Sequence, residues 1–107
     1  MHLAQVLLKQ RALQESMGCP MGQGEAAIKE NALAAIVEWT EVLAEINWKP
    51  WRKTRRLVNK LALAAELADV LQFWANAVNE AGLSAVDMES ALKLKWKLNE
   101  ERLKNDY

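Results

Sequence analysis

The sequence predicts an all-α fold in which four helices form an antiparallel bundle. Apolar residues recur at helical spacing through most of the chain, and no segment alternates apolar and polar residues as a strand does. Glycine and proline gather between these stretches, which indicates short connections and favours antiparallel neighbours. A length of 107 residues is typical of a single domain, here residues 1–107.

Turn and capping residues give the expected boundaries of the helices. Ser84 is expected to cap the last helix, with Asp87 at the matching position of a capping box. Thr54 is the candidate N-cap of the third helix, which should end before Gly82. Pro50 lies in the connection before that helix, because proline interrupts a helix. The expected helices span residues 2–16, 25–46, 54–80 and 84–104.

The composition is that of a folded protein with no charge bias. Hydrophobic residues make up 51% of the chain and charged residues 26%, so disorder is not expected. A formal net charge of zero argues against a nucleic-acid coat protein and a cationic membrane binder. The sequence suggests no membrane span and no secretion signal. Cys19 is the only cysteine, so no disulfide is expected within the chain, and a cytoplasmic location is expected.

The apolar surface exceeds what one small core can bury. Five tryptophans and many leucines and alanines indicate self-association, as a homodimer or a homotetramer. The third helix is apolar on nearly all sides and is therefore expected to be buried. The second helix carries an expected packing stripe at Leu33, Ile36, Val37, Thr40 and Leu43.

Four carboxylates interrupt these two apolar helices. Glu38 and Glu41 lie three residues apart in the second helix, and Glu66 and Asp69 have the same spacing in the third. This spacing places both members of a pair on one helix face. Two such faces turned toward each other would repel, unless a hard divalent cation such as magnesium lies between them. The pattern alone leaves two other interpretations open: a solvated face, or ion pairs with a neighbouring helix.

Several other chemistries lack the residues they need. His2 is the only histidine, which argues against a catalytic triad and a zinc site of the usual His/Cys type. No glycine-rich loop is followed by Lys-Ser or Lys-Thr, so a P-loop enzyme is excluded. The basic run within residues 49–60 is interpreted as a solvated face, and its alternatives are steering of an anionic nucleotide and binding of DNA.

Two segments, Glu38-Trp-Thr-Glu41 and Glu66-Leu-Ala-Asp69, resemble the E-x-x-E…E-x-x-D signature of the all-α nucleoside triphosphate pyrophosphohydrolases. That superfamily includes MazG-like enzymes, dCTP pyrophosphatases and dimeric dUTPases. Trp48-Lys-Pro-Trp51 is similar to the W-K-x-W segment of dimeric dUTPases, and Gln72-Phe73 stands where they commonly have His-Phe. Their C-terminal pattern is matched by Lys95, Asn99, Arg102 and Tyr107. The resemblance covers nearly the whole chain.

The resemblance implies a bundle of this superfamily's type, completed by dimerisation, and a hydrolase that uses Mg²⁺, with Mn²⁺ as a substitute. The implied reaction cleaves dUTP to dUMP and pyrophosphate. One alternative is a MazG-like house-cleaning enzyme acting on dCTP or modified deoxynucleoside triphosphates. A second alternative is a non-catalytic helical interaction module. No nucleic-acid or membrane partner is expected.

The resemblance also implies roles for individual residues. Glu38, Glu41, Glu66 and Asp69 would bind the metal. Glu41 is favoured over Glu38 as the residue that positions or deprotonates the attacking water. The implied phosphate ligands are Lys95, Arg102, Tyr107 and Lys49. The implied base and sugar contacts are Asn99, Gln10, Gln14, Trp48, Trp51 and Gln72.

The residue chemistry agrees with part of this assignment. Lys95, Asn99 and Arg102 lie at i, i+4 and i+7, so they share one helix stripe and can face one ligand. Arginine offers a fork for phosphate oxygens, and asparagine offers a donor and an acceptor for a uracil or cytosine edge. Other interpretations remain open, because the two cations also suit a solvated helix end, and Trp48 and Trp51 also suit core or dimer contacts.

Overall fold

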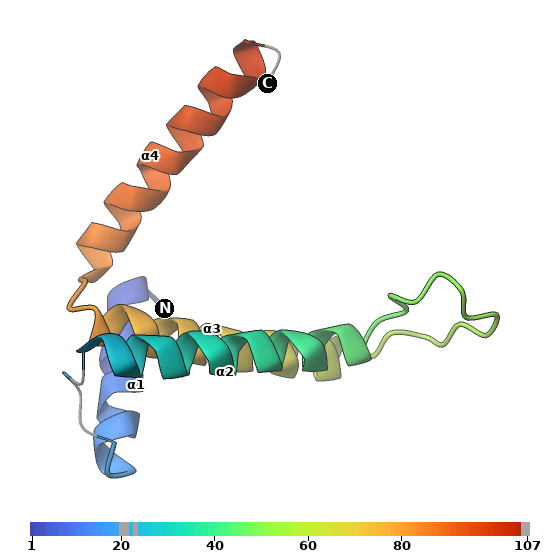
Figure 1. Cartoon of the computed structure of the whole chain (residues 1–107), viewed down its shortest axis with the longest axis horizontal. Helices are drawn as coiled ribbons and strands as arrows, with labels where there is room; N and C mark the ends of the chain where they lie inside the picture. Colours follow the sequence, from blue (N-terminus) through green and yellow to red (C-terminus); the bar gives the residue numbers. More distant parts are fainter. Residues whose placement is uncertain (20–21, 23, 106–107) are drawn as a thin grey trace.

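The computed structural model describes residues 1–19, 22 and 24–105. Within this part of the chain all regular structure is helical, which confirms the predicted all-α fold with its four helices. The helices are α1 (Leu3–Ser16), α2 (Gly24–Ala44), α3 (Lys60–Glu80) and α4 (Ala85–Lys104). Figure 1 shows α2 and α3 running side by side in opposite directions, with α1 lying across them and α4 projecting away.

The small core lies where α1 crosses α3. Leu7, Ala75 and Val78 are buried together there, and the first turn of α4 packs against them through Ala85 and Met88. Asn79 ties the two helices by a hydrogen bond, because its Nδ2 donates to the Leu7 carbonyl oxygen at 2.9 Å within the core. This crossing fixes α1 relative to the long α2–α3 pair.

The predicted cap of α4 is confirmed. The Ser84 hydroxyl accepts a hydrogen bond from the Asp87 backbone N–H at 3.1 Å, and the Ser84 N–H donates to Asp87 Oδ2 at 2.8 Å. These two bonds satisfy donors that a helix start otherwise leaves unpaired. Gly82 adopts a φ of +71° just after α3, as expected for a residue that ends a helix.

The predicted start of α3 is wrong, because the helix begins at Lys60 and not at Thr54. Asn59 is the N-cap, and its Oδ1 accepts from the Ala62 backbone N–H at 3.1 Å. The Asn47 side chain binds the backbone N–H and carbonyl of Arg56. A helix through residue 56 would need those same backbone groups, so this contact holds the segment in a loop.

The predicted packing stripe of α2 is also wrong for the single chain. Leu33 is 54% exposed, Ile36 61% and Val37 58%, while the face with buried Ala27 and Val42 is the one that is covered. Helical spacing identifies an apolar face without saying which face the neighbouring helix covers. Both faces of α2 can pack, and within one chain the alanine-rich face does so.

The expected burial of α3 holds only in part. Val70, Ala75 and Val78 are buried, but Leu67 and Leu71 remain about half exposed. By length and composition α3 is apolar enough to cross a membrane, a test that the packed helix of a bundle also passes. The helix lies along α2 and carries two carboxylates in its middle, and charged side chains are costly near the centre of a bilayer.

α4 takes little part in the packing of the chain. Only its first turn packs against the small core, and none of its described residues is buried. Apolar side chains are exposed along its length at Val86, Leu92, Leu94, Trp96, Leu98 and Leu103. One chain therefore supplies four helices but leaves the bundle open on the side of α4.

Candidate active site

Three carboxylates from the two long helices converge at the middle of the α2–α3 pair. Glu38 on α2 and Glu66 and Asp69 on α3 each offer an oxygen, and these oxygens lie within 4.8 Å of one another. All three side chains are half-buried. The spacing of three in α3 and the antiparallel course of α2 place them on facing sides. The sequence predicted that Glu41 would join them, but the converging group contains only these three.

The cluster is electrostatically strained. Partial burial raises the pKa of Glu66 above its ordinary value, and the negative charges of Asp69, Glu41, Glu38 and Glu45 raise it further. Glu41 is exposed and lies outside the three converging oxygens, although its charge acts on Glu66. Glu45 was not among the predicted site residues. Its position seven residues after Glu38, on the same helix face, was the signal that could have identified it.

These residues fit a magnesium ion. Carboxylate oxygens are the ligands that this hard cation prefers, and a charged cation between them offsets the repulsion that raises the pKa of Glu66. Opposite ligands of an octahedral magnesium lie roughly 4.2 Å apart, so small side-chain adjustments would bring the three oxygens to one ion. Remaining positions of such an ion are commonly filled by water and by substrate phosphates.

A pocket of about 550 Å³ lies one helical turn from the carboxylates, on the side of α1. Ala34 precedes Glu38 by one turn, and Phe73 follows Asp69 by one turn, so both helices place the pocket at the same side of the cluster. Gln14 of α1 and Asn31 of α2 add amide groups to its lining. An aromatic ring with nearby amides can bind a flat ring that has hydrogen-bonding edges.

The amide of Asn31 is held in place by its neighbours. Its Nδ2 donates to the Ala27 carbonyl at 2.9 Å, and its Oδ1 accepts from Asn76 Nδ2 at 3.2 Å. Asn76 is 2% exposed, and its Oδ1 has no hydrogen-bond partner among the described residues. The prediction missed Phe73, Asn31 and Asn76 as site residues. All three could have been found from helical spacing, since Phe73 follows Asp69 by four residues, Asn76 follows it by seven, and Asn31 precedes Glu38 by seven.

The predicted base contacts are only partly brought to this pocket. Gln14 lines it, whereas Gln10 is buried one turn earlier on α1 and is not part of the lining. Gln72 is exposed, and its neighbour Phe73 lines the pocket instead. Gln72 is therefore on the outer side of α3 in the single chain.

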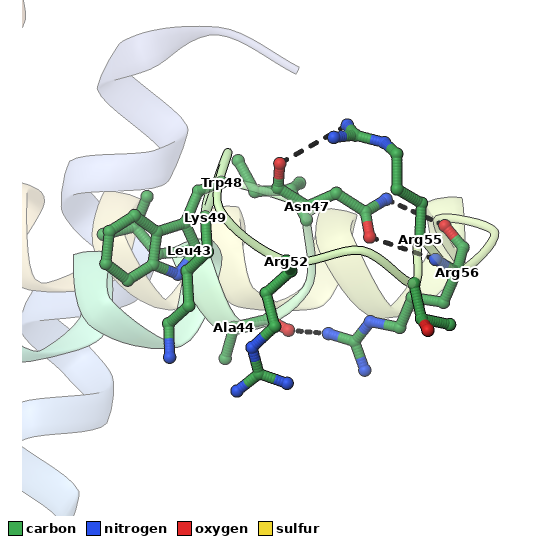
Figure 2. Close-up of a pocket in the computed structure, with 10 residues that line it drawn as sticks. Leu43, Ala44, Asn47, Trp48, Lys49, Arg52, Arg55 and Arg56 are labelled. Atoms are coloured by element: carbon green, nitrogen blue, oxygen red, sulfur yellow. Dashed lines mark hydrogen bonds between the residues drawn. The ribbon is translucent and has the colours of Figure 1, made fainter.

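The loop between α2 and α3 forms a second, basic pocket of about 440 Å³ at the other end of the carboxylate cluster (Figure 2). Trp48 and Lys49 line it, together with Arg52, Arg55 and Arg56. Trp51 does not line it, and it is 68% exposed with its ring edge-on to Trp48 at 5.7 Å between centroids. The Lys49 ammonium lies 5.4 Å from the Trp48 ring centroid.

The predicted C-terminal ligands lie apart from the carboxylates in the single chain. Lys95, Asn99 and Arg102 are exposed on α4, which projects from the rest of the molecule (Figure 1). The predicted phosphate ligand Tyr107 lies outside the described residues. One chain thus unites the acidic cluster with two pockets, and it leaves the Lys-Asn-Arg stripe elsewhere.

Comparison with known families supplies the remaining observation. The sequence model of a dUTPase family, of the all-α dimeric type, matches residues 2–107, which is nearly the whole chain. No curated protein and no solved structure matches the chain. The match agrees with the helical fold and with the acidic cluster at the centre of the α2–α3 pair. It makes the protein a dUTPase-like nucleoside triphosphate hydrolase. The chain belongs to the dUTPase family.

Proposed function

We propose that this protein hydrolyses dUTP to dUMP and pyrophosphate, with magnesium held by Glu38, Glu66 and Asp69. One observation carries the proposal: three carboxylate oxygens within 4.8 Å of one another lie one turn from a pocket lined by an aromatic ring and amides. The first feature suits a metal–phosphate complex, and the second suits a pyrimidine base. Family membership supports dUTP as the nucleotide.

The protein's own residues divide the work of the reaction. Glu38, Glu66 and Asp69 would hold a magnesium ion, which would supply positive charge to offset the negative charge that develops during phosphoryl transfer. Glu41 lies next to the cluster without joining the three converging oxygens, so its carboxylate is available to orient or deprotonate the attacking water. Phe73 would stack on the base, while Gln14 and Asn31 would bind its polar edge. A base with the wrong edge would leave the remaining N–H groups and acceptor sites of these amides unpaired, which is a basis for selectivity.

A second copy of the chain would complete the site. The apolar residues left exposed on α2 and α4 exceed what a monomer of this size usually presents, and a homodimer that closes the bundle would cover them. In such a dimer the α4 of the partner would carry Lys95, Asn99 and Arg102 to the phosphates and base at the carboxylates. Oligomerisation is a general property of the family, and the dimer is our choice among oligomers.

Mixing two inactive variants tests this arrangement. Glu41→Gln and Asn99→Ala each damage one half of the proposed site, and the variants can be unfolded together and refolded as a mixture. If Lys95, Asn99 and Arg102 act on the carboxylates of the other chain, up to roughly a quarter of wild-type activity returns. Half of the refolded dimers then contain one chain of each variant, and each such dimer has one intact site out of two. If both halves act within one chain, no activity returns, and the trans arrangement is wrong.

The hydrolysis itself is tested with a charge-matched control. Glu38→Gln should abolish magnesium-dependent release of pyrophosphate from dUTP while the far-ultraviolet circular dichroism stays unchanged. Glu15→Gln removes the same charge from an exposed position on α1 and should leave the rate unchanged. A wild-type protein that binds magnesium but releases no pyrophosphate from any deoxynucleoside triphosphate would contradict the proposed function.

A further inference from the structure

The loop between α2 and α3 concentrates positive charge beside the acidic cluster. From residue 46 to residue 65 the chain contains no Asp or Glu, although Glu45 and Glu66 lie immediately on either side. Six cations fall within this stretch: Lys49, Arg52, Lys53, Arg55, Arg56 and Lys60. Like charges this close repel one another, so the loop needs either a constraint or an anion to hold them together.

Asn47 supplies the constraint. Its Oδ1 accepts from the Arg56 backbone N–H at 3.1 Å, and its Nδ2 donates to the Arg56 carbonyl oxygen at 2.8 Å (Figure 2). One side chain thereby closes a loop whose ends are nine residues apart. The cations between these ends are held on a short, closed segment, which reduces the cost of ordering them around a ligand.

The side chains of two arginines in the loop have a structural partner, whereas the Arg52 side chain has none among the described residues. Arg56 Nη2 donates to the Ala44 carbonyl, and Arg55 Nη2 donates to the Asn47 carbonyl at 3.4 Å. The Ala44 carbonyl lies at the C-terminal end of α2, where carbonyl groups lack helical partners and attract cations, and the Asn47 carbonyl follows three residues later in the connection. The Arg52 guanidinium makes no hydrogen bond or ion pair with any residue that the structure describes.

Arg52 and Lys49 line the same pocket as Trp48, and no acidic residue is part of its lining. Figure 2 shows the Lys49 ammonium and the Arg52 guanidinium extending to the same side of the loop. A free guanidinium fork beside a point charge suits the closely spaced oxygens of linked phosphates. A pocket of about 440 Å³ on one short loop suits a small anion better than an extended nucleic-acid strand.

The position of this pocket matches the course of a bound nucleotide. Along α2 the order is the amide pocket at Asn31 and Ala34, then Glu38, then the basic pocket at Ala44. The antiparallel α3 gives the same order, since Phe73 lies on one side of its two acids and the loop on the other. Ala44 is about 9 Å beyond Glu38 along the helix, a separation that an extended triphosphate can span.

We propose that this loop pocket binds the two phosphates beyond the cleaved bond, first within the triphosphate and then as the pyrophosphate product. Arg52 is the main anion ligand, and Asn47 is a positioning residue that holds the loop closed. The identity of the nucleotide rests on the proposed function, whereas the recognition of a short polyphosphate rests on the loop alone.

Calorimetric titration of the full chain with inorganic pyrophosphate, in EDTA and at fixed ionic strength, tests the pocket. Arg52→Gln should weaken binding by about tenfold or more, as expected for losing a charge-assisted hydrogen bond. Lys53→Gln is the matched control, because it removes the same charge from the same loop outside the pocket lining, and it should change binding less than about threefold. Asn47→Ala keeps every cation and should still weaken binding, while circular dichroism verifies the helices.

Equal losses in Arg52→Gln and Lys53→Gln would overturn the pocket, because they would show attraction by net charge alone. Tighter, Arg52-dependent binding of duplex DNA would overturn its assignment to a short polyphosphate. A dUTP analogue with an imido group between the α and β phosphates is not cleaved, so it tests binding of the intact triphosphate separately from binding of the pyrophosphate product. Its binding must also weaken in Arg52→Gln, and unchanged binding would overturn the contact with the intact triphosphate.

These results are separable from the proposed function. If the wild-type protein cannot hydrolyse dUTP but binds pyrophosphate in a way that depends on Arg52, the phosphate site is supported and the proposed reaction is contradicted. Rapid hydrolysis of dUTP, together with pyrophosphate binding that is unchanged in Arg52→Gln and Asn47→Ala, would contradict the proposed phosphate site and leave the proposed reaction standing.

Discussion

Replacing Glu66 with glutamine should change stability and activity in opposite directions. The charges of Asp69, Glu41, Glu38 and Glu45 all act on Glu66, so one neutral substitution removes four repulsions at once. Glutamine keeps the size and most of the shape of the side chain, so packing along α2 is preserved. In EDTA the variant should therefore unfold at a higher urea concentration than the wild type.

The pH dependence of this gain has a definite sign. The folded-state pKa of Glu66 lies above its ordinary value of 4.5, so the folded chain holds this proton more tightly than the unfolded chain. Protonation of Glu66 therefore increases the free energy of unfolding of the metal-free wild type as the pH falls through the folded pKa toward 4.5. The stability advantage of Glu66→Gln should be largest above the folded pKa and should vanish below pH 4.5.

Activity should move the other way, because the same carboxylate is a proposed metal ligand. Loss of a group next to a metal site typically weakens metal binding by about 10–100-fold, and loss of a direct ligand should raise the magnesium concentration for half-maximal activity by at least that factor. Urea unfolding in EDTA from pH 4 to pH 8 and magnesium titration of pyrophosphate release measure the two effects. A variant that is less stable than the wild type at pH 8, or one with an unchanged magnesium requirement, would refute the reasoning.

Three further substitutions probe the pocket, the core and the cap of α4. Phe73→Ala should raise the KM for dUTP about 5- to 150-fold, the range expected when base stacking worth about 1–3 kcal/mol is lost, and an unchanged KM would show that the ring does not contact the base. Asn79→Ala should lower the free energy of unfolding in urea by about 1–2 kcal/mol because the buried bond to the Leu7 carbonyl is lost, and a neutral result would mean that this bond does not hold α1. Ser84→Ala should speed amide hydrogen exchange in the first turn of α4 by about tenfold, with no change in the middle of α3. Hydrogen bonds from the backbone and side chain of Ser84 lower the pKa of Asp87, its partner in that cap. The stabilisation of the cap by Asp87 is therefore present above the ordinary pKa of 3.8 and is lost as the pH falls through the lower folded pKa. Hydrogen-exchange protection of the first turn of α4 that stays constant down to pH 2 would contradict this.

Local signals in the sequence predicted the fold well where the interactions are themselves local. The cap at Ser84 and the end of α3 before Gly82 depend on residues within three or four positions, and both are where the sequence placed them. The start of α3 depends on Asn47 reaching Arg56, nine residues away. Nothing in the residues around Thr54 signals that contact, so the helix was predicted to begin too early.

The site was predictable to the extent that helical spacing fixes it. Spacing of three within each pair, together with antiparallel helices, predicts that Glu38 meets Glu66 and Asp69, but the same spacing also predicted Glu41, which lies outside the three converging oxygens. It does not decide which apolar face of α2 is covered, and Leu33 and Ile36 are consequently exposed in the single chain. The position of Lys95, Asn99 and Arg102 likewise depends on what packs against α4, and no pattern within one chain specifies that neighbour.

The most direct test is pyrophosphate release by the wild-type protein from dUTP, dCTP, dTTP, dATP and dGTP, with magnesium and with EDTA. We predict release from dUTP that requires magnesium, with kcat/KM at least about tenfold above that for each of the other four, because a base with the wrong edge leaves the pocket amides unpaired. Equal release from all five nucleotides would contradict recognition of the base in the amide pocket. Release that persists in EDTA would contradict a metal at the carboxylates.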